Sequence, residues 1–146
     1  MPKWRDILKG AWAWRWRAAR SGPLAHKEGG VRLEPSEIAK LAVEAASDKK
    51  ASDVVQLDIR ELSIIADYFV ICTGSNSRQI QAIASAVEDR LSEAKVPTRG
   101  REGAAETGWV LLDCGDVIVH FFGPMERDYY RLERLWSSAP TVVYMQ

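Results

Sequence analysis

Cys72 and Arg78 are the residues whose types and spacing most suggest chemistry. Five residues separate them, between a predicted strand and a predicted helix. Cysteine phosphatases use this spacing to place a thiolate and an arginine around a phosphate that loop amides hold at a helix N-terminus. A buried cysteine followed by a solvent-facing arginine explains the same residues, and no neighbouring acid is clearly placed as a leaving-group donor. The phosphatase interpretation is therefore the alternative, not the preferred one, because short motifs often match by chance.

Gly74 and Ser75 precede the same predicted helix and suggest a second kind of phosphate chemistry. Nucleotidyltransferases hold triphosphate with such a turn and need two or three carboxylates to bind metal. No Asp-x-Asp pair follows on a predicted strand. Asp113 and Asp116 flank a predicted hairpin turn, where aspartate is common for conformational reasons. Metal-assisted transfer is disfavoured.

A nucleophilic site could be built from Cys114, His120 and one of the two turn aspartates, because histidine is the usual base and a carboxylate orients it. A tight turn makes their proximity automatic, however. A histidine between apolar strand residues is more often packed in a core or an interface than used as a base. No cluster of His, Cys, Asp or Glu has zinc or calcium spacing. The sequence predicts no catalytic residue, metal or cofactor.

Composition is that of one globular domain, with 146 residues, 47% of them hydrophobic and 27% charged. The longest apolar runs, residues 109–112 and 117–122, are far shorter than the ~20 residues that span a bilayer. The two cysteines lack metal-binding spacing and are predicted to be buried free thiols in a reducing compartment. These features indicate a cytoplasmic protein without a membrane segment.

Charged side chains are distributed unequally along the chain. Residues 1–34 hold eight basic and three acidic side chains, a balance of +5, so the remainder carries −5 and would not bind DNA or RNA through bulk charge. If the first part is helical, it presents a stripe of Trp4, Leu8, Trp12 and Trp16, which is compatible with an interfacial or RNA-contacting helix. A disordered extension is the alternative. The predicted organisation is an extension at 1–35, a domain at 36–138 and a tail at 139–146.

Hydrophobic periodicity predicts an α/β (α+β) domain with a mixed sheet of about five strands and helices packed on it. Ser36 is predicted to cap a first helix that ends at the polar run 47–50. Strands at 53–59 and 67–73 should pair antiparallel, and residues 74–77 should cap a helix that buries its apolar stripe on the sheet. The rest of the chain is predicted to form strands at 109–113 and 117–122, a helix from Gly123, and a tail or short added strand.

Hairpin register decides which residues share a face. A two-residue loop places Trp109, His120 and Phe122 together, predicted to be a partly exposed aromatic patch, whereas a three-residue loop would reverse the faces. The opposite face, wholly apolar, is predicted to be core: Val110, Leu112, Val119 and Phe121. In the final helix the predicted buried stripe is Met125, Tyr129, Leu132 and Trp136, with Arg127, Arg131 and Arg134 on another face. Aromatic and arginine side chains of this kind anchor protein interfaces.

Three blocks carry a resemblance to a known family: LDIRELSIIADYFVICTGSNSRQIQAIA, then REGAAETGWVLLDCGDVIVHFF, then ERDYYRLERLW. Their order and gaps over about residues 36–137 resemble the ribosomal silencing factor family, RsfS, also called Iojap. The resemblance implies a fold similar to a nucleotidyltransferase without its catalytic carboxylates. It also implies a protein that binds the large ribosomal subunit at the ribosomal protein numbered fourteen and blocks joining of the small subunit when nutrients are scarce.

Matched residue by residue, the resemblance implies partner-binding roles for two groups. The family's tryptophan falls on Trp109 and its hairpin histidine on His120. With Phe122, which the hairpin register places beside them, these are the predicted central positions, and Arg127 and Tyr130 are predicted at the rim. Other characteristic positions are Asp116 and the pair Glu102 and Gly103. Phe122 belongs to a Phe-Phe pair that stands where other members often have one aromatic or aliphatic residue. A homodimer of the free protein is a further expectation, whereas DNA binding, membrane binding and catalysis are not expected.

Overall fold

The computed structural model describes residues 33–64, 66–135 and 138–145. Six strands form one mixed sheet in the order β3-β4-β5-β2-β1-β6. The strands are β1 (Ser52–Asp58), β2 (Tyr68–Thr73), β3 (Gly100–Ala104), β4 (Trp109–Asp113), β5 (Val117–Phe122) and β6 (Thr141–Met145). The α/β class is confirmed, with one strand more than the roughly five expected: β3 was not among the predicted strands, and the end of the chain forms the short added strand β6, antiparallel to β1.

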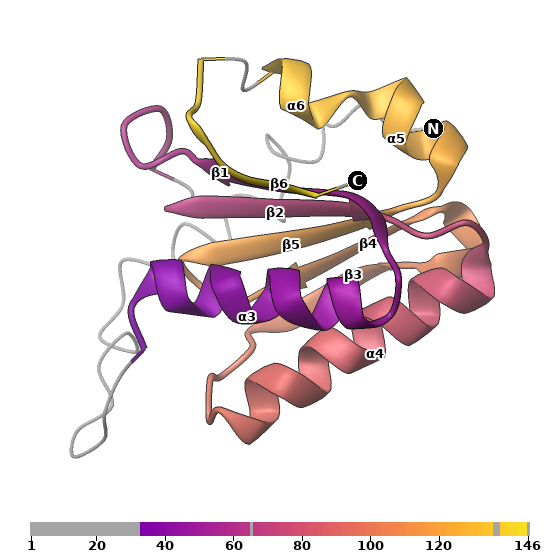
Figure 1. Ribbon diagram of the computed structural model, residues 1–146, viewed down its shortest axis with the longest axis horizontal. Coiled ribbons are helices and arrows are strands. Elements are labelled where there is room, and N and C mark those ends of the chain that lie inside the picture. Colours follow the sequence, from indigo (N-terminus) through magenta and orange to yellow (C-terminus); the bar gives the residue numbers. More distant parts are fainter. Residues whose placement is uncertain (1–32, 65, 136–137, 146) are drawn as a thin grey trace.

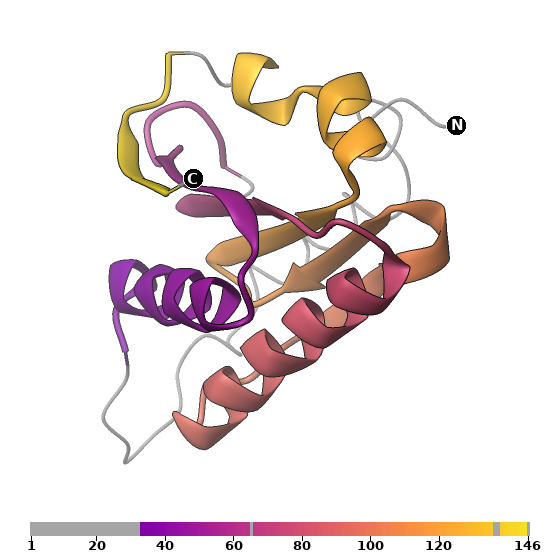
Figure 2. The ribbon, with the colours of Figure 1, turned by 45° about the vertical axis from the view of Figure 1, so that its right-hand side comes forward.

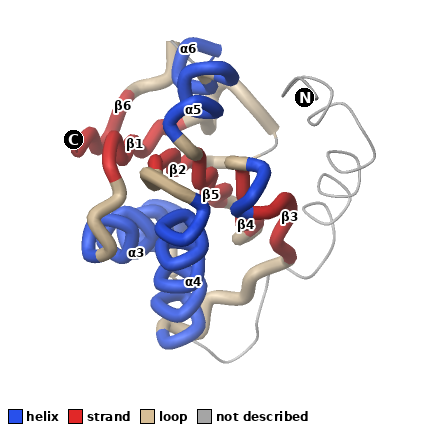
Figure 3. The backbone as a smooth tube through the Cα atoms, turned by 90° about the vertical axis from the view of Figure 1, so that its right-hand side faces the viewer, coloured by secondary structure: helices blue, strands red, loops and turns tan. Residues whose placement is uncertain are grey.

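Helices cover both faces of this sheet, so that the molecule has three layers (Figures 1 and 2). One face carries α3 (Pro35–Asp48) and α4 (Ser77–Glu93), and the other carries α5 (Pro124–Tyr130) and α6 (Leu132–Leu135). Figure 3 shows the sheet between these two pairs of helices. No helix in the described ranges is long and apolar enough to cross a lipid bilayer. The stripe predicted for Trp4 to Trp16 lies outside the described residues.

The first two helices follow their sequence patterns closely. α4 buries the predicted stripe, which consists of Ile80, Ile83, Ala84, Val87 and Leu91. Asn76 caps it, since its side-chain oxygen accepts a hydrogen bond from the Gln79 N–H at 2.9 Å. The prediction that Ser36 caps α3 is wrong: Pro35 already occupies the first turn, and the Glu37 carboxylate accepts the Glu34 N–H at 3.1 Å.

Strand pairing also follows expectation. β1 and β2 pair antiparallel as predicted, and the β4–β5 hairpin has the predicted register, in which Trp109 faces Phe122 and Leu111 faces His120. The structure adds a parallel pairing of β2 with β5, which the sequence analysis did not predict. Gly115, with φ near +85°, makes the tight turn. The Asp113 carboxylate accepts the Gly115 N–H at 2.8 Å, which confirms the interpretation of that aspartate as turn chemistry.

The helix at the end of the chain differs from its prediction. Instead of one helix there are two, because Arg131 adopts the left-handed conformation with φ near +47° and ends α5. The change of direction leaves Met125 80% and Tyr129 60% exposed, so the predicted buried stripe is wrong for these residues. Tyr130 and Leu132 are buried against the sheet in their place, and Trp136 lies outside the described residues.

Candidate functional site

An aromatic cluster of Trp109, His120, Phe122 and Tyr130 forms where β4, β5 and α5 meet. The Trp109 ring lies 4.5 Å from Tyr130, 5.0 Å from Phe122 and 5.9 Å from His120, between ring centroids. Trp109 is partly buried, whereas His120 and Phe122 are fully enclosed and Tyr130 is nearly so. The structure therefore brings the predicted aromatic residues together but exposes only the indole.

The prediction of a partly exposed patch is wrong for His120 and Phe122, for a clear physical reason. α5 and α6 cover one face of the sheet (Figure 1). Both side chains lie on that face: Phe122 belongs to the cluster of Phe69, Ile71 and Leu132, and the His120 ring contacts Phe69. The hairpin register alone cannot show that a later helix folds back over this face. A direct contact of either side chain with a partner would require these helices to move.

Two glycines, one directly before Trp109 and one on the neighbouring strand, set the backbone conformation around this residue. Gly108, directly before it, has φ near +81°, and its carbonyl accepts the Gly123 N–H at 2.9 Å, which ties the start of β4 to the start of α5. On the neighbouring strand Gly103 has φ near +83°, and a Cβ there would collide with the Trp109 carbonyl oxygen. A glycine is thus required at position 103 by the backbone of Trp109. Glu102, its partly exposed neighbour on β3, pairs with Leu111.

Arg127 makes hydrogen bonds within the protein, although it was predicted to lie at the rim of the partner-binding surface. Its side chain is only 11% exposed; Nε donates to Glu133 Oε1 at 2.8 Å, and Nη1 donates to Thr73 Oγ1 at 2.8 Å. These bonds join α5 to α6 and to the end of β2. Tyr130 is also enclosed, and burial raises the pKa of its phenol, with Tyr129 and Glu126 adding to the effect.

Asp116 does not join this cluster. It sits in the β4–β5 turn, where its carbonyl accepts the backbone N–H groups of Asp67 at 2.7 Å and Tyr68 at 3.2 Å. Because Tyr68 pairs with Val117 at one end of β2 and Thr73 pairs with Phe122 at the other, Asp116 and Trp109 occupy opposite ends of the sheet.

Sequence reasoning missed two exposed residues on α5, the helix whose Tyr130 packs against Trp109. Met125 and Tyr129 are one turn apart on α5 and point to solvent, and the Tyr129 ring packs edge-on against Tyr130 at 5.1 Å. Large hydrophobic side chains exposed on a helix that also packs against a half-buried tryptophan, here through Tyr130, are typical of a protein contact surface. The missing signal was the helix break at Arg131, since a continuous helix turns these residues inward.

The residues considered for catalysis do not assemble. Cys114 packs on the α3–α4 face of the sheet, whereas His120 packs on the α5–α6 face, so the nucleophile-and-base arrangement is ruled out by strand alternation. Cys72 is fully buried, its Sγ–H donates to the His120 carbonyl at 3.7 Å, and burial raises its pKa to about 12. Arg78 is exposed on α4.

Polar groups of the turn at residues 74–76 are also hydrogen-bonded within the protein. Gln79 Oε1 accepts both the N–H and the hydroxyl of Ser75, at 2.6 and 2.7 Å. A Cβ on Gly74 would approach Ile80 Cγ1 to 2.9 Å, so close packing of α4 explains the glycine. Over the described part of the chain, no three His, Cys, Asp or Glu side chains gather as a metal ion requires.

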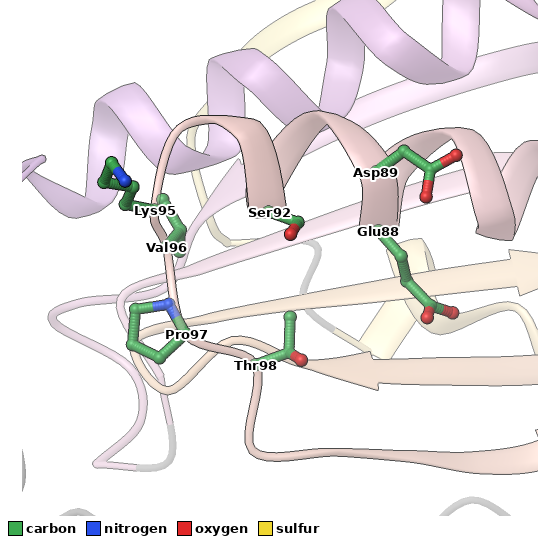
Figure 4. Close-up of a pocket in the computed structure, with 7 residues that line it drawn as sticks. All are labelled: Glu88, Asp89, Ser92, Lys95, Val96, Pro97 and Thr98. Atoms are coloured by element: carbon green, nitrogen blue, oxygen red, sulfur yellow. The ribbon is translucent and has the colours of Figure 1, made fainter.

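Two hollows lie away from the cluster. One, of about 640 Å³, lies at the end of α4 and is lined mainly by polar side chains; Figure 4 shows Glu88, Asp89, Ser92, Lys95, Val96, Pro97 and Thr98 around it. The other, of about 750 Å³, lies between α5–α6 and β1 and carries three arginines and three carboxylates: Arg127, Arg131, Arg134, Asp53, Asp128 and Glu133. That balance of charge favours neither an anion nor a cation.

Acid should destabilise the protein through His120. Burial, together with the smaller effect of the positive charge of Arg127, lowers the pKa of this imidazole to about 3. The unfolded chain takes up a proton near pH 6.5, so the stability that the neutral side chain contributes is fully present above pH 6.5 and is lost as pH falls toward 3. Urea unfolding at pH 7 and pH 5 should show wild type losing ~2 kcal/mol more than His120→Phe; equal losses would contradict this.

Comparison with known proteins adds an independent observation. Residues 32–146 match the model of the family described as "Ribosomal silencing factor during starvation". The chain is 47% identical over 110 residues to the ribosomal silencing factor RsfS of Halalkalibacterium halodurans, covering 75% of this chain and 94% of that protein. It is 26% identical over 134 residues, covering 83% of this chain and 59% of the relative, to the mouse protein named "Mitochondrial assembly of ribosomal large subunit protein 1".

A crystal structure of a Chromobacterium violaceum protein superposes with a TM-score of 0.69 at 43% sequence identity. It covers 72% of this chain and 88% of the other. Agreement in sequence and in fold therefore extends over the same part of the chain that holds the aromatic cluster.

Proposed function

The chain belongs to the ribosomal silencing factor family, and from that membership we propose that it binds the large ribosomal subunit and blocks joining of the small subunit. The contact is with the ribosomal protein numbered fourteen, as the family resemblance implies. Translation is thereby repressed when nutrients are scarce. The site of action is the cytoplasm, and the free chain forms a homodimer, which light scattering coupled to size exclusion would check.

The half-buried Trp109 is the observation that supports a binding function most directly; it packs on Tyr130 of α5, the helix that also exposes Met125 and Tyr129 to solvent. Its indole has one face packed on Tyr130 and Phe122 and is held by a hydrogen bond to His120, so little freedom is lost when a partner covers the rest. Rigid aromatic side chains with this surrounding are typical anchors of protein interfaces.

A steric mechanism needs no catalytic group. The buried residues His120, Phe122 and Tyr130 support the surface from beneath, and Arg127 holds α5 against α6. The fully enclosed Cys72 and the self-satisfied turn at Ser75 fit this role and do not fit a phosphate-handling enzyme.

Co-sedimentation tests the proposed function. The purified chain is mixed with isolated large or small ribosomal subunits, and bound protein is measured in the pellet through a sucrose cushion. We expect binding to large subunits only, for the full chain and for one that starts at Ser36. Equal recovery with small subunits, or none with large subunits, would contradict the proposal.

Cys72 provides a test against the enzymatic alternative. Because burial raises the pKa of both Cys72 and Cys114 to about 12, iodoacetamide at pH 8 should leave both thiols of the native chain unmodified, as read by mass spectrometry. Denatured chain is the positive control. Cys72→Ser should retain binding to large subunits. Rapid native alkylation of Cys72, with loss of a phosphatase activity, would support the alternative.

A further inference from the structure

His120 is too enclosed to touch a partner. Only 2% of the residue is exposed, and three aromatic rings surround its imidazole: Phe69 at 4.9 Å, Trp109 at 5.9 Å and Phe122 at 6.0 Å. His120 can therefore affect the affinity for a partner only indirectly, through a residue that it contacts.

One polar bond links it to the exposed surface. Trp109 Nε1–H donates to His120 Nδ1 at 3.2 Å, and because an indole nitrogen can only donate, Nδ1 must be the unprotonated acceptor. The imidazole proton then resides on Nε2. This bond fixes both the tautomer of His120 and the rotation of the indole.

The other ring nitrogen shows why the imidazole is not simply filling space. His120 Nε2 is buried and has no hydrogen-bond partner among the residues that the structure describes. Enclosing an unpaired N–H is unfavourable, and a phenylalanine would occupy the same apolar pocket without this cost. What the imidazole offers and a phenylalanine does not is the acceptor for Trp109.

We propose that His120 is a positioning residue, which holds the Trp109 indole in the orientation that the ribosomal partner recognises without itself contacting that partner. This inference rests on the proposed function and gives the buried histidine a role that the aromatic surface alone does not explain. A general-base role is excluded by the same geometry, because the lone pair of Nδ1 is occupied by the indole proton.

Three substitutions separate positioning from packing. His120→Phe fills the pocket without an acceptor, and His120→Leu removes the acceptor with a smaller side chain, in case the larger ring does not fold. His120→Asn places a carbonyl oxygen close to the position of Nδ1 and is the conservative rescue. Each variant is first checked for folding by circular dichroism and urea unfolding.

The readouts are affinity for large subunits and, in the free chain, solvent exchange of the Trp109 Nε1 proton by NMR, with Trp109→Phe used to assign the signal. Loss of one hydrogen bond should weaken affinity about 5- to 10-fold in His120→Phe or His120→Leu, with faster indole exchange, and His120→Asn should restore both. In a Trp109→Phe background the same His120 substitutions should have no further effect on affinity.

A folded His120→Phe with wild-type affinity would overturn the proposal, and so would an unchanged penalty in the Trp109→Phe background. Failure of the wild-type chain to bind large subunits would overturn the proposed function and the partner-directed part of this inference. Indole exchange, measured without ribosomes, would still confirm or overturn the positioning of Trp109 in that event.

Discussion

Trp109→Ala is expected to weaken binding to the large ribosomal subunit by ~30-fold or more. Truncating a central aromatic anchor typically costs about 2 kcal/mol or more of binding free energy, which corresponds to that factor. Here the substitution removes the exposed indole face and leaves the His120 acceptor without its donor. The measurement is a titration of labelled chain with large subunits.

The matched control is Ile64→Ala. Ile64 is also a large exposed hydrophobic residue, 75% accessible, but it lies in the loop between β1 and β2, at the opposite end of the sheet from Trp109. Its truncation should leave affinity unchanged. Stability of both variants is measured in the same buffer, so that a binding loss is interpreted only where the chain is folded. Wild-type affinity in folded Trp109→Ala would remove the main support for the surface.

Phe122→Ala should act on stability. The side chain is completely buried between Trp109, Tyr130 and His120, and phenylalanine-to-alanine changes in a core typically lower the free energy of unfolding by about 3–5 kcal/mol. Urea unfolding measures this loss. Phe122→Leu, which keeps most of the apolar volume, should lose much less stability and retain most of the affinity for large subunits.

The pair of Phe122 variants distinguishes a core residue from a contact residue. If Phe122 supports the surface only from beneath, affinity and stability should fall together across the two substitutions. A Phe122→Leu chain that is as stable as wild type but no longer binds would show that the ring itself reaches the partner, contrary to its position in the structure.

Local patterns in the sequence were sufficient for most of the sheet and for α4. The antiparallel pairing of β1 with β2, the hairpin register and the buried stripe from Ile80 to Leu91 depend on alternation, helical periodicity and turn residues. All of these are visible along a short stretch of chain. The same alternation correctly separates Val110 and Phe121 from Trp109 and Phe122.

The errors at the candidate site arise where distant parts of the chain meet. Nothing near Arg131 signals a left-handed residue, because such a conformation is uncommon outside glycine and here depends on tertiary packing. The resulting break exposes Met125 and Tyr129 and sends Tyr130 inward. The burial of His120 and Phe122 depends in turn on α5 and α6 covering the sheet, a contact between segments that hairpin register cannot reveal.

The candidate site was therefore predictable by residue type and less so by role. Trp109 was predicted to be an anchor, a role that stays a prediction, and it is the member of the cluster that stays partly exposed. Arg127, expected at a rim, instead bonds to Thr73 and Glu133. The resemblance matched Gly103 to a characteristic family position without giving a physical reason for a glycine there. The structure gives that reason, because only a residue without Cβ fits against the Trp109 carbonyl at that backbone conformation.

Subunit joining tests the central claim most directly. Purified large subunits are preincubated with wild-type chain, Trp109→Ala or Ile64→Ala, small subunits are added, and formation of joined ribosomes is followed by light scattering. Joining should be inhibited by wild type and by Ile64→Ala in proportion to the large subunits occupied, and Trp109→Ala should need a concentration ~30-fold higher or more for the same effect. Undiminished joining at saturating wild-type chain would contradict steric exclusion.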